Sequence, residues 1–355
     1  MNLYAVIMAG GVGSRFWPRS KKKKPKQLLK IFGENTLIQN TVARLNGLVP
    51  NENILIITNK AQENGIKSQL PYIPPENIIS EPFGKNTAAC IGLASVLIDQ
   101  KDKDAVMITL PADHLILDVD HFHNTLKKAV AFAEKSGGLV TIGIKPTRPE
   151  TGYGYIQYID KPLEDKIYKV RTFAEKPNLL TAKRFLESGD FLWNSGMFIW
   201  KTKAILNELN LYLNDLYLGM ESLRKDIGKE NFYDSLTKVY GQLRSISIDY
   251  GVMEKSQNVY LTKAEFSWSD VGSWEEVYQL SEKDQNGIAK VGKIYTDHSY
   301  NSYIYSPKKF AAIIGCENLI VINTKNALLV CNRDNAQDVK KVVDYLKMNN
   351  ETGLL

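Results

Sequence analysis

The amino-acid sequence predicts an α/β protein in which helices flank a mostly parallel β-sheet and a smaller β domain follows. Two observations predict the first part: apolar segments of strand length, and segments of helical spacing that alternate with them along the chain. A third observation predicts the second part, because short β-like segments separated by turn residues replace this alternation after residue 287. A chain of 355 residues is long enough for both.

The first half of the chain carries four apolar segments that suit buried parallel strands. Residues 3–9 (LYAVIMA) are apolar throughout and rich in strand formers, as expected for a strand covered on both faces. Similar segments occupy residues 53–58, 105–114 and 139–144. Helical spacing lies between them, in residues 36–48, 86–99 and 119–136. This order is typical of βαβ units.

The pattern is less regular from residue 150 to residue 285. We expect strands in residues 168–177 and 196–206, and helices in residues 181–188 and 227–243. Beyond residue 287, short β-like segments appear at residues 293–296, 302–306, 311–315, 319–324 and 327–331. A final helix is expected over residues 335–349, with Asn335 as its N-cap. The predicted domains are residues 1–285 and residues 286–355.

Composition and charge exclude several classes of protein. The net charge of +6 is modest, and nucleic-acid binders usually concentrate far more basic charge, so we expect no nucleic-acid partner. No run of about 18 apolar residues is present, so we expect no membrane association. The N-terminus lacks the basic region of a signal peptide. Three scattered cysteines (Cys90, Cys316 and Cys331) form neither a metal spacing nor a disulfide framework, which favours a cytoplasmic location.

The segment that follows the first predicted strand is rich in glycine and positive charge. Gly10, Gly11 and Gly13 carry no side chains, so their backbone N–H groups can approach phosphate oxygens closely. The segment is not a Walker loop, because no Gly-Lys-Ser/Thr string follows at the required spacing. It is not a dinucleotide-binding fingerprint either, because Phe16 stands where that motif requires glycine. The sequence therefore predicts a different kind of phosphate-binding loop.

Two cations of this segment are the candidates for catalytic contact with phosphate. The planar guanidinium of Arg15 directly follows the glycines and can hold two phosphate oxygens at once. Lys26 comes directly after Pro25, which restricts its backbone. The neighbouring run Lys21–Lys24 is interpreted as a solvated lid.

Two aspartates are the candidate ligands of a magnesium ion. A nucleoside triphosphate needs a divalent cation, and Mg²⁺ prefers one or two carboxylates together with phosphate oxygens. Asp113 lies at the carboxyl end of the third predicted strand, on the same sheet edge as the glycine-rich loop. Asp270 lies between Trp268 and Trp274, where an unpaired carboxylate would be costly. Taken alone, each aspartate could equally be a capping or turn residue.

Several short motifs together resemble one family. They are AGGVGSRFWPRSKKKKPKQ, EPFGKNTA, LPADH, GYGYI, EKP, WNSGMF, SIDYGVMEK and WSDVGSW, in that order. Each motif alone is weakly specific, but their order and spacing from about residue 3 to residue 345 resemble the mannose-1-phosphate guanylyltransferases, which are sugar nucleotidyltransferases. The resemblance implies a Rossmann-like catalytic domain followed by a domain similar to a left-handed β-helix. One departure is Ala89-Cys90, where the family often has proline, which concerns local helix geometry.

The resemblance also implies a role for particular residues. Those expected at the nucleotide are Gly10, Gly11, Gly13, Arg15, Lys26, Glu81, Asn86, Thr87 and Asp113, and those expected to bind Mg²⁺ are Asp113 and Asp270. Those expected at the sugar phosphate are Gly154, Glu175, Lys176, Asn194 and Asp249. The printed sequence ends at residue 355, so we expect no isomerase domain of the kind found in bifunctional members. A homodimer is also expected from the resemblance.

The implied reaction transfers GMP from GTP to mannose 1-phosphate, with GDP-mannose and pyrophosphate as products. The attacking phosphate monoester is already an anion, so the reaction needs no general base, only positioning and charge neutralisation. Three alternatives stay open at this point. They are the same chemistry on another base or sugar, a non-catalytic sensor of nucleotide sugars, and an interaction protein that assembles through the β domain.

Overall fold

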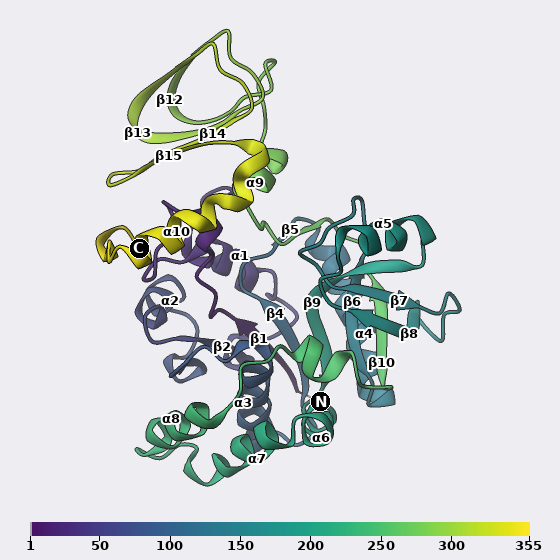
Figure 1. The fold of residues 1–355 in the computed structure, drawn as a ribbon. Helices are drawn as coiled ribbons and strands as arrows, with labels where there is room; N and C mark the ends of the chain where they lie inside the picture. Colours follow the sequence, from purple (N-terminus) through teal and green to yellow (C-terminus); the bar gives the residue numbers. More distant parts are fainter. Residues whose placement is uncertain (1) are drawn as a thin grey trace.

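The computed structural model describes residues 2–355 and contains one large mixed sheet (Figure 1). The strand order is β3-β2-β1-β4-β9-β6-β10-β8-β7. The strands are β1 Leu3–Met8, β2 Ile54–Asn59, β3 Ile78–Glu81, β4 Val106–Pro111, β6 Leu139–Ile144, β7 Tyr155–Tyr158, β8 Ile167–Ala174, β9 Phe191–Lys201 and β10 Val259–Lys263. Strands β9 and β8 run opposite to the other strands, so most of the sheet points one way. The expected α/β architecture is confirmed.

Helices cover both faces of this sheet. The helices of this domain are α1 Leu37–Ala43, α2 Glu63–Gln69, α3 Asn86–Lys101, α4 Val119–Ser136, α5 Leu179–Ser188, α6 Thr202–Tyr212, α7 Asn214–Ser222 and α8 Phe232–Gln242. A further helix, α9 Trp274–Leu280, packs against the C-terminal part of the chain instead. Strand β9 ends at Lys201, so the second half of the segment 196–206, expected as a strand, is the first turn of α6 instead. This part of the segment is helical because the spacing of Ile205, Leu206 and Leu209 places all three side chains on one buried face of α6.

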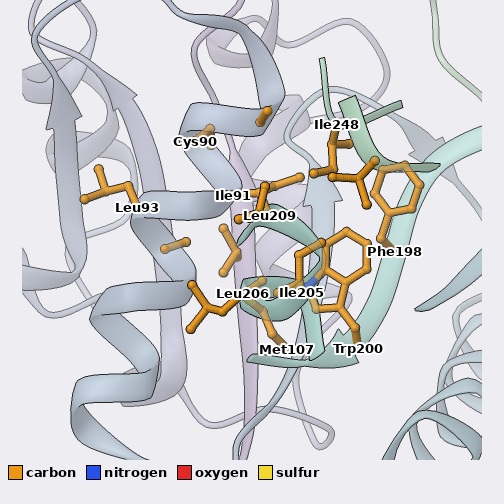
Figure 2. Close-up of a cluster of buried hydrophobic side chains, with 14 of the residues drawn as sticks. Cys90, Ile91, Leu93, Met107, Phe198, Trp200, Ile205, Leu206, Leu209 and Ile248 are labelled. Carbon is orange, nitrogen blue, oxygen red and sulfur yellow. The ribbon is translucent and has the colours of Figure 1, made fainter. Parts of the chain in front are cut away.

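Apolar packing holds helices against both faces of the sheet. Helix α3 is buried along nearly its whole length, because its small residues permit close approach to the strands beneath it. Figure 2 shows part of this core, a single cluster that includes Cys90 and Ile91 of α3, Leu206 and Leu209 of α6 and Trp200 of β9. A second cluster lies under α1, α2 and α4. Cys90 is therefore a core residue.

The smaller domain is a four-stranded sheet in the order β12-β13-β14-β15, drawn in light green to yellow at the top of Figure 1. Its strands are β12 Ala289–Asp297, β13 Tyr303–Ile314, β14 Leu319–Asn323 and β15 Leu328–Asn332, and helix α10 Val339–Met348 follows. The segments expected at 302–306 and 311–315 form the single strand β13. The boundary between residues 285 and 286 stays a prediction.

The predicted cap of the final helix is wrong. Asn335 lies inside a 3₁₀ turn, Arg333–Asp338, that precedes α10. The side chain of Asn332 caps this turn by accepting a hydrogen bond from the N–H of Asp334. The sequence offers two asparagines three residues apart, and the one at the end of β15 is the cap because its backbone is extended, as an N-cap requires.

The two domains share one hydrophobic cluster. Phe16 and Trp17 of the glycine-rich segment pack with Trp274 of α9, Tyr303 of β13 and Val343 of α10. The indole N–H of Trp274 donates to the carbonyl of Trp17 (3.1 Å). The β domain therefore supports the segment that carries the predicted phosphate loop. Among the helices of residues 2–355, none combines the length and apolar character that a membrane span requires.

Candidate functional site

The predicted site residues gather at the carboxyl ends of β1, β3 and β4, around two adjoining cavities. The larger cavity has a volume of about 490 Å³ and the smaller about 250 Å³, and both are lined by His114 and Asp270. The larger is lined by Gly10, Gly11, Glu81, Asn86, Thr87, Gly154, Glu175, Asn194 and Asp249, and the smaller by Gly13, Arg15, Lys26 and Asp113. Lys176 contacts Glu175 at the rim. The structure thus brings the predicted residues together.

The glycine-rich loop presents free backbone donors to these cavities. Within residues 2–355, the N–H groups of Gly10, Gly11 and Gly13 donate no hydrogen bond. Hydrogen bonds to its carbonyl groups fix the backbone of the loop: Gln27 donates to the carbonyl of Gly11 (3.0 Å), and Ser20 donates to that of Gly13 (2.6 Å). Gly13 has a φ of 68°, and a Cβ there would stand 2.4 Å from the Cβ of Lys26. Glycine is therefore required at this position.

Lys26 connects the two candidate metal ligands. Its ammonium is almost fully buried and donates to Asp113 Oδ2 (2.8 Å) and to the backbone carbonyl of Asp270 (2.5 Å). Burial raises the pKa of the Asp113 carboxyl, but the charge and hydrogen bond of Lys26 outweigh it, so the net pKa is lowered. Asp113 is therefore ionised at neutral pH. Arg15 is exposed and lines the same cavity.

The surroundings of Asp270 favour its ionised form less than those of Asp113 do. Burial, and then the negative charge of Glu276, raise the pKa of Asp270 to about 6. The hydroxyl of Tyr153 donates to its Oδ1 atom. Burial and the charge of Glu276 outweigh the charge of Lys26, which lowers the pKa of Asp270, and a bound cation would favour the ionised carboxylate further.

The two aspartates fit a divalent cation that is shared with a phosphate-bearing ligand. Among residues 2–355 no group of three or more His, Cys, Asp or Glu side chains could hold a metal ion without other ligands. Two carboxylates facing one cavity, with free backbone donors beside them, match the preference of Mg²⁺ for one or two carboxylates plus phosphate oxygens.

An aromatic cluster forms part of the wall of the larger cavity, which Tyr153 and Trp268 line. The ring of Tyr153 makes edge-to-face contacts with Trp193 and Trp268, and Trp268 contacts His114 in the same way. The indole N–H of Trp268 donates to Nδ1 of His114 (3.1 Å), and burial lowers the pKa of His114 to about 4. His114 is therefore a neutral support rather than a source of charge.

A buried carboxyl group marks one end of the larger cavity. Glu81 ends β3, and burial raises its pKa to about 7, although a hydrogen bond from the hydroxyl of Tyr240 (3.0 Å) opposes this. Gly10 lies beside it, since a Cβ on Gly10 would stand 3.6 Å from Oε2 of Glu81. Asn86 and Thr87 begin α3 next to this carboxyl, and the Thr87 hydroxyl accepts a hydrogen bond from the N–H of Ile248 (2.8 Å).

A cluster of polar side chains marks the other end. The Asn194 amide donates to Asp249 Oδ1 (2.8 Å), and the Asn194 N–H donates to the carbonyl of Gly154 (2.8 Å). Glu175 forms an ion pair with Lys176. Burial, and then the charge of Glu175, raise the pKa of Asp249 to about 6. A Cβ on Gly154 would stand 2.4 Å from Oε2 of Glu175, so glycine allows this approach.

Sequence reasoning missed the side chains that position the predicted ones. Tyr153, which holds Asp270, stands inside the motif GYGYI, so a polar ring between two glycines was an available signal. Glu276, which accepts from the N–H of Gly272 and pairs with Arg148 (2.9 Å), follows WSDVGSW by two residues. Tyr240 gave no signal, because it appears as one more apolar residue in the pattern of α8.

Comparison with known proteins agrees with this geometry. The family model described as nucleotidyl transferase matches residues 4–287, and a model described as MannoseP isomerase/GMP-like beta-helix domain matches residues 295–346. Fold and site therefore define a nucleotidyltransferase, an enzyme. A mannose-1-phosphate guanylyltransferase of Escherichia coli is 39% identical over 98% of this chain and 76% of its own length. One of Salmonella muenchen is 42% identical over 98% of this chain and 74% of its own length. The chain belongs to the mannose-1-phosphate guanylyltransferase family.

Two solved structures support the same assignment of fold. A crystal structure from Thermus thermophilus, described as a mannose-1-phosphate geranyltransferase, superimposes with a TM-score of 0.88 at 32% identity and covers 98% of this chain and 100% of that one. A structure from Helicobacter pylori, described as a mannose-6-phosphate isomerase, has a TM-score of 0.62 at 28% identity and covers 76% of this chain and 100% of that one. The first likeness extends over both domains.

Proposed function

We propose that this protein transfers GMP from GTP to α-D-mannose 1-phosphate, which yields GDP-mannose and pyrophosphate. One observation carries the proposal: a loop with free N–H donors and two cations lies between a buried carboxyl group at one end of the site and a polar cluster at the other. This order suits a nucleotide whose base, phosphates and incoming sugar occupy successive positions. The names of the relatives in the same family supply the substrate pair.

Glu81 supports guanine as the base. The guanine edge presents two adjacent donors, N1–H and the 2-amino group, and an ionised carboxylate can accept from both. Uracil and thymine present one donor flanked by carbonyl oxygens, which a carboxylate would repel. Tyr240 holds Glu81 Oε1, and Glu81 Oε2 lies beside Gly10 at the cavity. The specificity for guanine therefore rests on this carboxyl group.

The opposite end of the site supports a sugar phosphate. Glu175, Asn194 and Asp249 offer acceptors and donors for sugar hydroxyls, while Lys176 supplies a cation for the sugar's phosphate. Gly154 lets the carboxylate of Glu175 lie directly against the backbone, where it faces the cavity. These residues are proposed to bind the attacking substrate.

Asp113 and Asp270 are proposed to hold Mg²⁺ together with oxygens of the nucleotide. When bound, the ion neutralises phosphate charge as it develops. Lys26, which already touches both aspartate residues, is proposed to contact the phosphates at the same point.

The chain's own residues then supply position and charge. The N–H groups of Gly10, Gly11 and Gly13 bind phosphate oxygens, while Arg15 and Lys26 reduce the repulsion between the two anions. Since the attacking phosphate oxygen is already ionised, no general base is needed and pyrophosphate leaves in line, with no covalent intermediate. His114, neutral at pH 7, supports the wall of the site rather than transferring a proton.

A screen of pyrophosphate release tests this function directly. The purified protein is given GTP, ATP, UTP or dTTP, each with mannose 1-phosphate or glucose 1-phosphate, in the presence of Mg²⁺. We expect GTP with mannose 1-phosphate to give the fastest release. Faster turnover with UTP or dTTP would assign the chemistry to another base, and nucleotide binding without any release would make the protein a sensor.

Two further expectations are proposals as well. The family resemblance suggests a homodimer, which light scattering of the purified protein would test. The three cysteines are free, which suits a reducing cytoplasm, and fractionation of the producing cells would test that location.

A further inference from the structure

A second group of cations lies outside the site just described, where the glycine-rich segment meets the β domain. Two adjoining cavities, of about 290 Å³ and 500 Å³, share Tyr305, Thr324 and Lys325 in their walls. We call them together the basic hollow. None of its lining residues lines either cavity of the candidate active site. Its lining residues come from the N-terminal segment and from β13, β14 and the turn that follows β14, whose strands are labelled in Figure 1.

Its charge is entirely positive. The charged residues that line the basic hollow are Arg19, Lys21, Lys24, Lys308, Lys309 and Lys325, and no aspartate or glutamate lines it. Across residues 2–355, no carboxylate lies within ion-pair distance of any of these six side chains. Six cations around one concave surface repel each other, and a bound anion would relieve that repulsion.

The cations from the N-terminal side are held in place. The guanidinium carbon of Arg19 lies 4.1 Å from the centre of the Tyr305 ring, and Arg19 Nη2 donates to the carbonyl of Lys30 (2.6 Å). Lys21 and Lys24 exchange two backbone hydrogen bonds (2.9 and 3.0 Å), which places their side chains on the same face of a tight turn. The lysine run, expected to be a solvated lid, is therefore partly built into this wall.

We propose that the basic hollow binds a small molecule that carries several phosphate groups. A single phosphate carries at most about two negative charges, too few to balance six cations. Cations enter from two separate segments, residues 18–24 and 308–325, so a ligand with phosphates at separated points can contact both. A single-stranded nucleic acid is disfavoured, because such sites stack bases on exposed aromatic rings. Here the face of Tyr305 is already covered by Arg19.

The test alters only the β-domain wall. Residues 19–24 follow closely after the phosphate loop, and the Ser20 hydroxyl donates to the carbonyl of Gly13 in that loop. Changes in residues 19–24 would therefore disturb catalysis too. The test variant is Lys308→Ala/Lys325→Ala. The matched control, Lys293→Ala/Lys340→Ala, removes the same charge from exposed positions of the β domain outside the hollow.

Isothermal titration calorimetry with inorganic tripolyphosphate, and separately with adenosine 5′-tetraphosphate, measures binding to the full chain. We expect at least about tenfold weaker binding of one equivalent in the test variant and no weakening in the control, with either probe. The probe whose binding weakens more in the test variant shows whether the ligand is an inorganic polyphosphate or a nucleoside polyphosphate. Basal pyrophosphate release, measured without either probe, stays unchanged in both variants.

Two results would overturn the proposal. One is undiminished binding of both probes by Lys308→Ala/Lys325→Ala, or equal weakening in the control. The other is a 20-nucleotide RNA that binds more tightly than either probe and loses that binding in the test variant, which would make the hollow a nucleic-acid surface.

Discussion

Replacing Lys26 with alanine removes the cation that both candidate metal ligands share. Its ammonium donates to the Asp113 carboxylate and to the carbonyl of Asp270, and only 6% of its side chain is exposed. No other lysine or arginine of the described chain forms an ion pair with either aspartate. The variant therefore lacks one preorganised charge at the point where the two anionic substrates meet.

The expected loss of rate follows from that position. Removing one preorganised group that stabilises developing charge costs about 10²–10³ in turnover, roughly 3–4 kcal/mol. Nearby Arg15 lines the same cavity but is exposed, so it can replace little of the lost field. We expect turnover with GTP and mannose 1-phosphate to fall by that factor.

The variant should also lose some stability. A fully buried ion pair that loses one partner costs about 3–5 kcal/mol, but 35% of the Asp113 side chain is exposed, so water offsets part of this. We expect a loss of about 1–2 kcal/mol in the free energy of unfolding. Because Lys26 lowers the pKa of Asp113 below 3.8, this difference is complete above pH 3.8 and disappears as the pH falls through the lowered value.

Pyrophosphate release and urea unfolding measure both quantities on the same preparation. Lys23→Ala is the matched control, since Lys23 is exposed and lines none of the cavities described above. Wild-type turnover in Lys26→Ala would refute the reasoning, and so would an equal loss in Lys23→Ala.

Three further predictions concern the other parts of the site. Asp113→Asn combined with Asp270→Asn should abolish metal-dependent pyrophosphate release, and full rate at saturating Mg²⁺ would show that neither holds the ion. Glu81 has a pKa of about 7 against an ordinary 4.5, so it costs stability as the pH rises from 4.5 to 7, by about 3 kcal/mol in total. Urea unfolding of Glu81→Gln at pH 5 and pH 8 should lack that decline, and a decline equal to wild type would disprove it. Gly154→Ala would place a Cβ 2.4 Å from Glu175 Oε2 and displace that carboxylate. The KM for mannose 1-phosphate should then rise about tenfold while the KM for GTP stays unchanged. An unchanged KM for mannose 1-phosphate would show that Glu175 does not bind the sugar.

Much of the fold was predictable from periodicity. The expected helix over residues 119–136 matches α4 at both ends, because it is long and strongly amphipathic and a glycine with positive φ ends it at residue 137. The segment 196–206 was mispredicted because apolar residues continue from β9 into α6 without a break in hydrophobicity. In the β domain, the two segments expected at residues 302–306 and 311–315 belong to one strand, β13, and the break expected between them is a shift in its pairing with β12, which leaves residues 307–310 unpaired with that strand.

The candidate site was predictable where one residue's chemistry is enough to identify it. Glycines after a strand and a lysine after Pro25 indicate phosphate binding by themselves. Residues that act through another side chain give no such signal. Tyr240 is separated from Glu81 by 159 positions, and only the packing of α8 against β3 brings its hydroxyl to the carboxyl group. The same holds for the basic hollow, whose two walls come from opposite ends of the chain.

Anomalous diffraction from crystals grown with GDP-mannose and Mn²⁺ would locate the ion and the nucleotide in one experiment. If the account is right, the manganese peak lies between the carboxylates of Asp113 and Asp270, with the pyrophosphate group against the backbone of Gly11 and the guanine next to Glu81. A peak elsewhere, or a nucleotide bound away from the carboxyl ends of β1 and β4, would contradict it.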